Sequence, residues 1–142
     1  MKVKYDQPKV FSQSYKSLLG QRPIWDWRYD KLFWIDIYEN KIIETNQDNS
    51  KEKQYLVKEG VTNILLKDSE NYLMSSHDSI FSLQSLINKK QLLTKISLEN
   101  SNNRINDADI DINGQLWVST MDMEQKTDTG KIICYDINLN PI

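Results

Sequence analysis

The sequence contains a single cysteine, Cys134, and a single histidine, His77. One cysteine excludes an internal disulfide, and a reducing compartment is therefore expected. Cys134 alternates with Ile133 and Tyr135 in a strand-like pattern, which predicts a buried thiol. One histidine excludes a metal site built from several histidines, and the polar residues around His77 predict an exposed turn.

Long apolar segments are missing as well. No stretch approaches the length of about 20 apolar residues that spans a bilayer, and residues 1–6 lack the apolar core of a signal peptide. The formal net charge is −2, with both signs mixed along the chain, which gives no electrostatic basis for binding nucleic acid or an anionic membrane. We therefore expect a cytoplasmic protein whose 142 residues lie within the range of a single domain.

Several enzyme signatures are also missing. The sequence has only four glycines and no glycine-rich phosphate loop, and it contains neither a Gly-x-Ser-x-Gly elbow nor a Cys-x-x-Cys pair. The polar side chains that remain are rich in carboxylate and carboxamide oxygens. Such oxygens suit hard cations such as calcium, magnesium or manganese.

The most informative part of the sequence is the run from Arg104 to Asp122. Asn113-Gly114 predicts the two-residue turn of a β-hairpin, and Trp117 is expected to pack the returning strand. Apolar residues alternate on both sides of this turn, at Ile110, Ile112, Leu116 and Val118. Four polar residues crowd the entrance of the first strand, namely Arg104, Asn106, Asp107 and Asp109.

Two earlier segments, residues 25–36 and 64–75, repeat this strand–turn–strand pattern. Aligning their second strands places Trp34, Leu73 and Trp117 at equivalent positions, about 40 residues apart. Each copy is followed by a third short strand, and the first two copies by a fourth. We expect the third strands at residues 41–44, 79–83 and 131–135, and the fourth strands at 53–57 and 91–96.

Short strands that repeat at this spacing are typical of β-propeller blades, which bury their sheet faces against neighbouring blades. The sequence therefore predicts an all-β fold of the propeller type in one domain, residues 1–142. About three blades are present, at approximately 18–57, 62–97 and 104–142. Propellers close with about four to eight blades, and the third copy here ends before a convincing fourth strand. We therefore expect a partial ring.

Four motifs, in order and at blade spacing, resemble the SMP-30/gluconolactonase/LRE-like (regucalcin) family, in the N-terminal half of a family member. Residues 19–26 resemble its Leu-Gly-Glu-Gly-Pro-x-Trp-Asp motif, and residues 31–37 its Arg-Leu-Tyr-Trp-Val-Asp-Ile motif. Residues 104–107 match Arg-Phe-Asn-Asp, and residues 117–121 match Phe/Trp-Ala-Gly-Thr-Met.

The resemblance implies a six-bladed propeller that hydrolyses small sugar-type lactones. It implies one divalent metal near the axis (Ca, Zn, Mn or Mg), which polarises the lactone carbonyl for attack by water. It also implies that Arg104, Asn106 and Glu124 contact the substrate and that Asp107 has a supporting role. The family's catalytic aspartate falls beyond Ile142, so no catalytic residue is expected in this chain.

The chain departs from the family pattern beside the implied metal. Gln21 replaces the metal-binding glutamate, and its neutral amide oxygen is expected to weaken metal binding. Arg22 replaces a glycine and adds a positive charge next to the cation position. Ala108 also replaces a glycine, where a close backbone approach is expected.

Three interpretations therefore stay open. The chain is an incomplete lactone hydrolase, a degenerate non-catalytic propeller remnant, or a propeller-type interaction module. In each, the polypeptide alone is expected to lack lactonase activity. The resemblance also implies that residues 1–11 form a latch strand that pairs with a final blade. With that blade missing, we expect half-propellers to self-associate or a second chain to supply the remaining blades.

Overall fold

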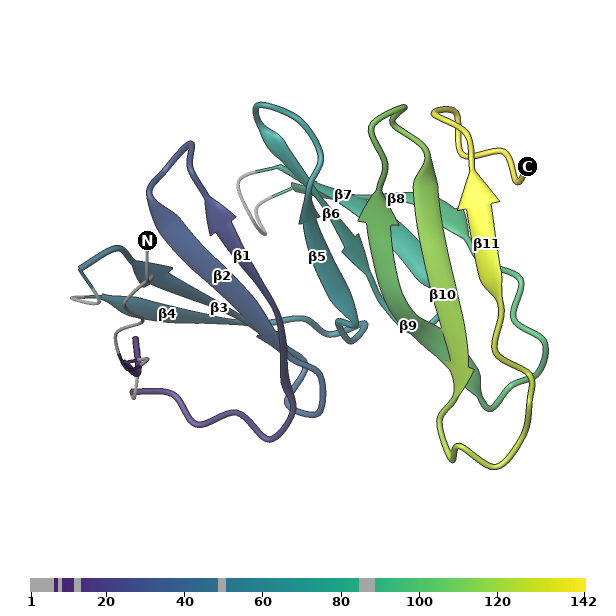
Figure 1. Ribbon diagram of the computed structural model, residues 1–142, viewed down its shortest axis with the longest axis horizontal. Helices are drawn as coiled ribbons and strands as arrows, with labels where there is room; N and C mark the ends of the chain where they lie inside the picture. Colours follow the sequence, from purple (N-terminus) through teal and green to yellow (C-terminus); the bar gives the residue numbers. More distant parts are fainter. Residues whose placement is uncertain (1–6, 8, 12–13, 49–50, 85–88) are drawn as a thin grey trace, which may run out of the picture.

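The structure, a computed structural model, describes residues 7, 9–11, 14–48, 51–84 and 89–142 (Figure 1). Within these residues all regular structure is β-strand, and three antiparallel sheets follow one another along the chain. This confirms the predicted all-β fold of the propeller type. Among the described residues there is no helix long and apolar enough to cross a membrane.

Each sheet is a meander in which consecutive strands pair, as short polar turns require. The first contains β1 (Gly20–Asp26), β2 (Lys31–Asp36), β3 (Lys41–Asn46) and β4 (Glu52–Leu56). The second contains β5 (Asn63–Leu66), β6 (Asn71–Ser75), β7 (Ser79–Gln84) and β8 (Lys89–Lys95). The third contains β9 (Asn103–Ile110), β10 (Leu116–Asp122) and β11 (Ile132–Tyr135), and a single bridge from Tyr135 to Pro141 follows it.

The first strands of the three sheets lie next to one another. β1 contacts β5, and β5 contacts β9, so these are the inner strands of the arrangement. Figure 1 shows the sheets side by side in chain order, with β5 between β1 and β9. Residues far apart in sequence can therefore meet along the inner strands.

Two apolar clusters hold the sheets together, because alternate side chains of the middle sheet point to opposite faces. Tyr72 and Met74 of β6 pack with Phe33 and Ile35 of the first sheet. The rings of Phe33 and Tyr72 meet edge to face, with centroids 5.6 Å apart. Leu73, between them in β6, instead joins a cluster with the third sheet that includes Ile105, Ala108, Leu116 and Val118.

The predicted equivalence of Trp34, Leu73 and Trp117 is confirmed for strand position, but for sheet face it holds only between Leu73 and Trp117 and is wrong for Trp34. All three lie in the second strands of their sheets. Leu73, in the second sheet, points toward the third sheet. Trp117, in the third sheet, points away from the second sheet, because its neighbours Leu116 and Val118 pack against the second sheet. Trp34 alternates with Phe33 and Ile35, which face the second sheet, and so it points the other way. A displacement by one residue in the alignment reverses the face.

The hairpin between β9 and β10 also differs from its prediction. Only Gly114 of the Asn113-Gly114 pair has a positive φ, 79°. Its amide donates to the carbonyl of Asp111, and Asp111 N donates to Gln115 O. These bonds make a type I turn followed by a left-handed glycine, a longer hairpin loop than the predicted two-residue turn. The Asp111 carboxylate stabilises it by accepting from Asn113 N and Gln115 N.

The predicted burial of individual side chains is confirmed at two positions and not at a third. Cys134 is buried and His77 is exposed, as predicted. Trp117 was expected to pack the returning strand, but it is 43% exposed, and its indole N–H donates to Asp111. The expected latch strand at residues 1–11 lies mostly outside the described residues, and residues 7 and 9–11 are not in a strand.

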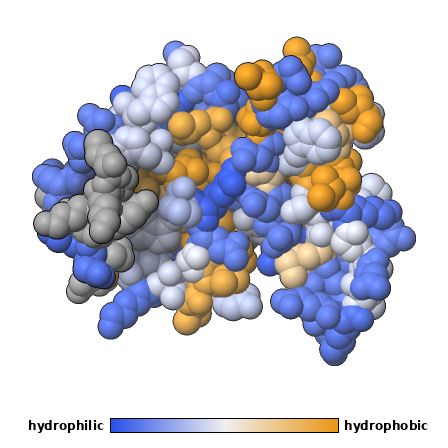
Figure 2. Space-filling model, in the orientation of Figure 1, coloured by the Kyte–Doolittle hydropathy of each residue, from blue (hydrophilic) through white to orange (hydrophobic). Residues whose placement is uncertain are grey.

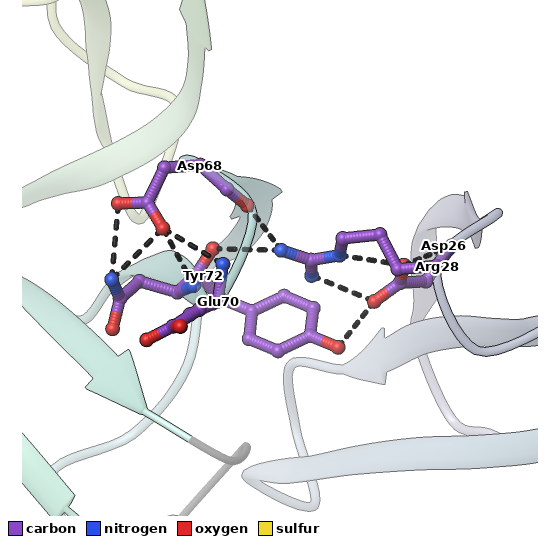
Figure 3. A network of polar contacts seen from close by, with 6 residues as sticks. Asp26, Arg28, Asp68, Glu70 and Tyr72 are labelled. Carbon is purple, nitrogen blue, oxygen red and sulfur yellow. Dashed lines mark hydrogen bonds and ion pairs between the residues drawn. The ribbon is translucent and has the colours of Figure 1, made fainter.

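A polar cluster around the buried Asp26 joins the turn between β1 and β2 to the turn between β5 and β6 and to Tyr72 of β6 (Figure 3). Arg28 donates from Nε and Nη2 to the two carboxylate oxygens of Asp26, at 2.8 and 2.7 Å. The Tyr72 hydroxyl donates to the same carboxylate, and Arg28 Nη1 donates to the carbonyl of Asp68. Asp26 is fully buried, and the Arg28 guanidinium lies 4.7 Å from the centre of the Tyr72 ring. Sequence reasoning did not find this cluster.

Candidate functional site

Gln21, the doubtful metal ligand, is exposed in β1, where it pairs with Ile35 of β2. It lines a cavity of about 380 Å³ together with Trp34 and Tyr15. This cavity lies on the face of the first sheet that points away from the second sheet, because Trp34 points that way. Gln21 therefore lines a cavity together with two aromatic side chains.

Arg22 lies in a β-bulge immediately after Gln21. Gln21 pairs with Ile35 and Ile24 with Phe33, so two residues of β1 oppose one residue of β2. Arg22 has a φ of 54°, a left-handed conformation that costs a non-glycine residue about 1–3 kcal/mol. Bulges redirect side chains and are common next to functional sites.

The bulge lets Arg22 reach the inner strand of the third sheet. Its Nη2 lies 3.2 Å from Oδ1 of Asp109, and its Nη1 lies 3.7 Å from Oδ1 of Asp107. Asn63 of β5 donates from its amide nitrogen to Asp107 and, at 2.9 Å, to the carbonyl of Ala108. One cluster therefore includes residues of all three inner strands. We call Arg22, Asn63, Asp107 and Asp109 the inner-strand cluster.

Arg104 and Asn106, the implied substrate contacts, lie near the start of β9. Arg104 is half-buried, and its Nη1 donates to the carbonyl of Ile105 at 2.8 Å. Burial lowers the pKa of the Arg104 guanidinium, and the nearby Tyr38 opposes this shift, but an arginine stays protonated in either case.

Asn106 occupies a bulge of its own. Ile105 pairs with Thr120 and Asp107 with Ser119, which leaves Asn106 as the extra residue in β9. The inner strands of the first and third sheets are therefore both bulged, at Arg22 and at Asn106. Because a bulge interrupts the alternation of side chains, it brings Asn106 and Asp107 out of the regular strand pattern.

Asp107, the implied supporting residue, is held by its own strand and by two neighbours. Its carboxylate accepts from Ala108 N at 2.9 Å and from Asn63. Its amide donates to the Ser119 hydroxyl of β10 at 3.1 Å. Together with the Arg22 contact, these bonds place Asp107 within the inner-strand cluster, and its supporting role stays a prediction.

Glu124 lies in the loop between β10 and β11, and Asp122 shapes the start of this loop. The buried Asp122 carboxylate accepts from the amides of Glu124, Lys126 and Thr127 at 2.9–3.1 Å and from the Thr127 hydroxyl at 2.8 Å. The Thr127 hydroxyl, followed by these amides, lowers the pKa of Asp122 to about 2. The Glu124 side chain is exposed and forms an ion pair with Lys126 at 2.9 Å.

The structure places Arg104, Asn106 and Glu124 at one end of the third sheet. Arg104 pairs with Met121, close to the end of β10, and Glu124 follows that end directly. Gln21 has the corresponding place in the first sheet, as the second residue of its inner strand. Within the described part of the chain, no hydrogen bond or ion pair joins Gln21, Arg104, Asn106 and Glu124 to one another directly.

The described residues do not fit a divalent metal site of their own. They contain no group of three or more histidine, cysteine, aspartate or glutamate side chains that could hold a metal ion. Gln21 contributes no charge, and the carboxylates of Asp107 and Asp109 are already paired with Arg22. No reaction step is therefore assigned to a metal held by these residues.

Sequence reasoning missed Asn63 and the role of Asp122, and it paired Arg22 with an implied metal instead of with Asp107 and Asp109. The contacts of Asn63 span 44 and 45 residues of sequence, so no local sequence pattern predicts them. For Asp122 a local signal existed, because an aspartate followed by Thr127 and several free amides is typical of a side-chain-capped turn.

Comparison with known proteins gives consistent matches. Regucalcin of Xenopus laevis is 24% identical over 115 residues, which cover 81% of this chain and 38% of that protein. The structure of regucalcin from Agrobacterium tumefaciens, described as a calcium-binding protein, matches with a TM-score of 0.81 and 20% identity, over 92% of this chain and 44% of that one. A gluconolactonase from Xanthomonas campestris matches with a TM-score of 0.67 and 10% identity, over 89% and 46%.

At such identities the likeness to solved structures shows the fold, and the chain spans less than half the length of these relatives. The family is shown by a separate match. The model of the SMP-30/gluconolactonase/LRE-like region matches residues 19–141, nearly the whole sequence. The chain therefore belongs to the SMP-30/gluconolactonase/LRE-like family.

Proposed function

We propose that this chain supplies one wall of a sugar-lactone-binding site, in a protein that hydrolyses the lactone ring. The family match over residues 19–141 carries this proposal, because gluconolactonase, an enzyme that hydrolyses a sugar lactone, is one of the names in the family description. The reaction adds water to the ring carbonyl and breaks the ring C–O bond. Because the chain covers less than half of its relatives, the complete activity belongs to a longer assembly than this chain.

The residues at the end of the third sheet suit recognition of a polyhydroxylated ring. Arg104 uses one Nη to bind its own strand, and its remaining N–H groups can donate to a carbonyl or hydroxyl oxygen. Asn106 offers a donor and an acceptor from the bulge. The Glu124 carboxylate accepts hydrogen bonds, and Asp122 holds the backbone that carries it. In this proposal these groups bind and orient the substrate, and Asp107 supports them.

The experiment is saturation-transfer NMR with a sugar lactam, the hydrolysis-resistant counterpart of a lactone. We expect weak binding to the chain that Arg104→Leu abolishes and the distant Lys51→Leu leaves unchanged. The unaltered chain is expected to hydrolyse no sugar lactone by itself. Absence of lactam binding, or binding that survives Arg104→Leu, would remove the proposal.

A non-catalytic role is the second candidate, and one observation favours it. Arg22 stands where the family pattern has a glycine. It forms ion pairs with the two carboxylates of the inner-strand cluster, which a glycine would leave unpaired by this position. A chain of this kind could keep the propeller scaffold without its chemistry. Lactam binding together with restored hydrolysis, when the remaining blades are supplied as a second polypeptide, would decide for the enzyme.

The proposal also includes a partner for the outward face of the third sheet. Trp117 and Ile132 on this face are 43% and 76% exposed, and Figure 2 shows apolar surface over the third sheet. Large exposed apolar side chains gathered on one face of a sheet are a candidate interaction site. We expect the chain to self-associate in light scattering and Trp117→Glu to reduce the apparent mass. A monodisperse monomer would contradict this expectation.

A further inference from the structure

The inner-strand cluster combines features that an ordinary surface ion pair does not need. Arg22 keeps a left-handed backbone conformation that glycine would adopt without strain. Its guanidinium reaches two carboxylates of another sheet, Asp107 and Asp109, which are more than 80 residues away along the chain. The backbone conformation alone would favour glycine at this position. The strain and the long reach together therefore indicate that arginine is present because of the contacts of its side chain.

The carboxylates of the cluster are only partly used by the protein. In both Asp107 and Asp109, Oδ1 accepts from the next backbone amide and faces Arg22. The described residues provide no hydrogen-bond donor to either Oδ2. The amide oxygen of Asn63 is buried and likewise has no partner in the described structure. The cluster therefore presents several oxygen atoms that could bind a cation.

Arg22 is the positive group that contacts the two carboxylates in the described structure, through Oδ1 of each. Asp107 and Asp109 are two residues apart in one strand, so their charges repel each other unless a cation lies between them. The Arg22 side chain is 24% exposed and its Nε is buried without a partner in the described structure, so the guanidinium lies against the two carboxylates although these are themselves exposed. The position that a metal ion would need is filled by the side chain.

We propose that Arg22 is the resident cation of the inner-strand cluster. Its guanidinium neutralises Asp107 and Asp109, ties β1 to β9 beside Asn63 of β5, and closes this group of oxygens to a divalent metal ion. The cluster then holds the inner strands without a metal. This inference does not rest on the proposed lactone binding, since it concerns only the charges of the inner strands.

Removing the guanidinium should convert the cluster into a cation site. Arg22→Gly also suits the backbone, because glycine adopts the φ of 54° without strain. Two carboxylates are a weak set of hard ligands, so we expect calcium to bind with a Kd of about 10⁻⁴–10⁻³ M.

The experiment uses Tb³⁺ as the probe, because it replaces calcium and emits light when a nearby tryptophan is excited. Trp117 pairs with Asp109 across the sheet and is therefore well placed to sensitise it. In the unaltered chain we expect no sensitised emission that depends on Asp109. Arg22→Gly should give saturable emission that calcium displaces and that the added change Asp109→Asn removes.

The matched control is Arg22→Lys, which keeps the positive charge and should behave like the unaltered chain. Arg22→Gln serves as a second neutral variant if Arg22→Gly does not fold, with circular dichroism as the check. Tb³⁺ binding to the unaltered chain that Asp109→Asn abolishes would overturn the proposal. Folded neutral variants that gain no Asp109-dependent emission would overturn it as well.

Discussion

Arg22 and Arg28 are six residues apart in the chain, yet their carboxylate pairs lie in opposite surroundings. The side chains of Arg28 and Asp26 are 7% and 0% exposed. Those of Asp107 and Asp109, the partners of Arg22, are 56% and 73% exposed. A buried pair is costly to break, because the remaining charge stays in a medium of low polarity. An exposed pair contributes little to stability and is free to serve a site.

The pair at Arg28 has the properties of a structural tie between the first two sheets. Burial alone would raise the pKa of Asp26, but the hydrogen bonds from Arg28 and Tyr72 outweigh it and lower the pKa. The Tyr72 hydroxyl is a donor to this carboxylate, and both its burial and this bond raise the Tyr72 pKa. Every group of the cluster therefore stays in one protonation state near neutral pH.

The largest effect is expected from Arg28→Leu, which leaves the Asp26 carboxylate buried without its cation. Breaking a buried pair in this way costs about 3–5 kcal/mol, and urea unfolding measures it as a lower midpoint. The double change Asp26→Asn with Arg28→Leu should recover part of the loss, because it removes the unpaired charge. If Arg28→Leu lowers the unfolding free energy by less than about 1 kcal/mol, this buried pair contributes no more to stability than an exposed ion pair does.

A smaller effect is expected from Tyr72→Phe. This change keeps the ring that packs on Phe33 and removes only the hydroxyl that donates to Asp26. Hydrogen bonds to charged groups contribute about 1.5–3 kcal/mol, so the unfolding free energy should fall by that amount. Tyr29→Phe, at an exposed ring beside the same arginine, is the matched control and should have almost no effect. Equal effects of the two changes would show that the hydroxyl of Tyr72 does not stabilise the cluster.

The sequence predicted the elements of the fold better than the contacts between them. Alternation and turn residues are local, so the strands around Trp34, Leu73 and Trp117 could be recognised. The face of Trp34 could not be derived, because a shift of one residue in the alignment reverses it.

The polar contacts between sheets were outside the reach of local patterns. Tyr72 and Asp26 are 46 residues apart, and Asn63 and Asp107 are 44 apart, so only the stacking of the sheets brings them together. The candidate residues Arg104, Asn106 and Glu124 came from a family resemblance, and the structure adds the bulge at Asn106 and the Asp122 turn that presents Glu124. Their role in binding stays a prediction.

A local effect of pH is expected at the Asp122 turn. Its folded pKa is about 2, below the ordinary value of 3.8, because Thr127 and neighbouring amides donate to the ionised carboxylate. The stabilisation is therefore fully present above about pH 4 and is lost as the pH falls through about 2. NMR should show the Glu124 and Thr127 amide shifts titrating near pH 2, and Asp122→Asn should abolish that titration. A midpoint near pH 4 would mean that these bonds do not hold the carboxylate.

The smallest effect is expected at Arg22, whose carboxylate partners are exposed, whereas the carboxylate partner of Arg28 is buried. Arg22→Ala removes both ion pairs and should cost no more than about 1 kcal/mol, because exposed pairs contribute about 0–1 kcal/mol. Arg22→Gly removes the same pairs but relieves the strain at a φ of 54°, so it should be more stable than Arg22→Ala. The difference between the unaltered chain and Arg22→Ala should also shrink between about 0.05 and 0.5 M NaCl, as screening predicts. Urea unfolding at both salt concentrations measures these differences. A cost like that of Arg28→Leu, unchanged by salt, would show that the inner-strand cluster is a second structural tie and would erase the contrast between the two arginines.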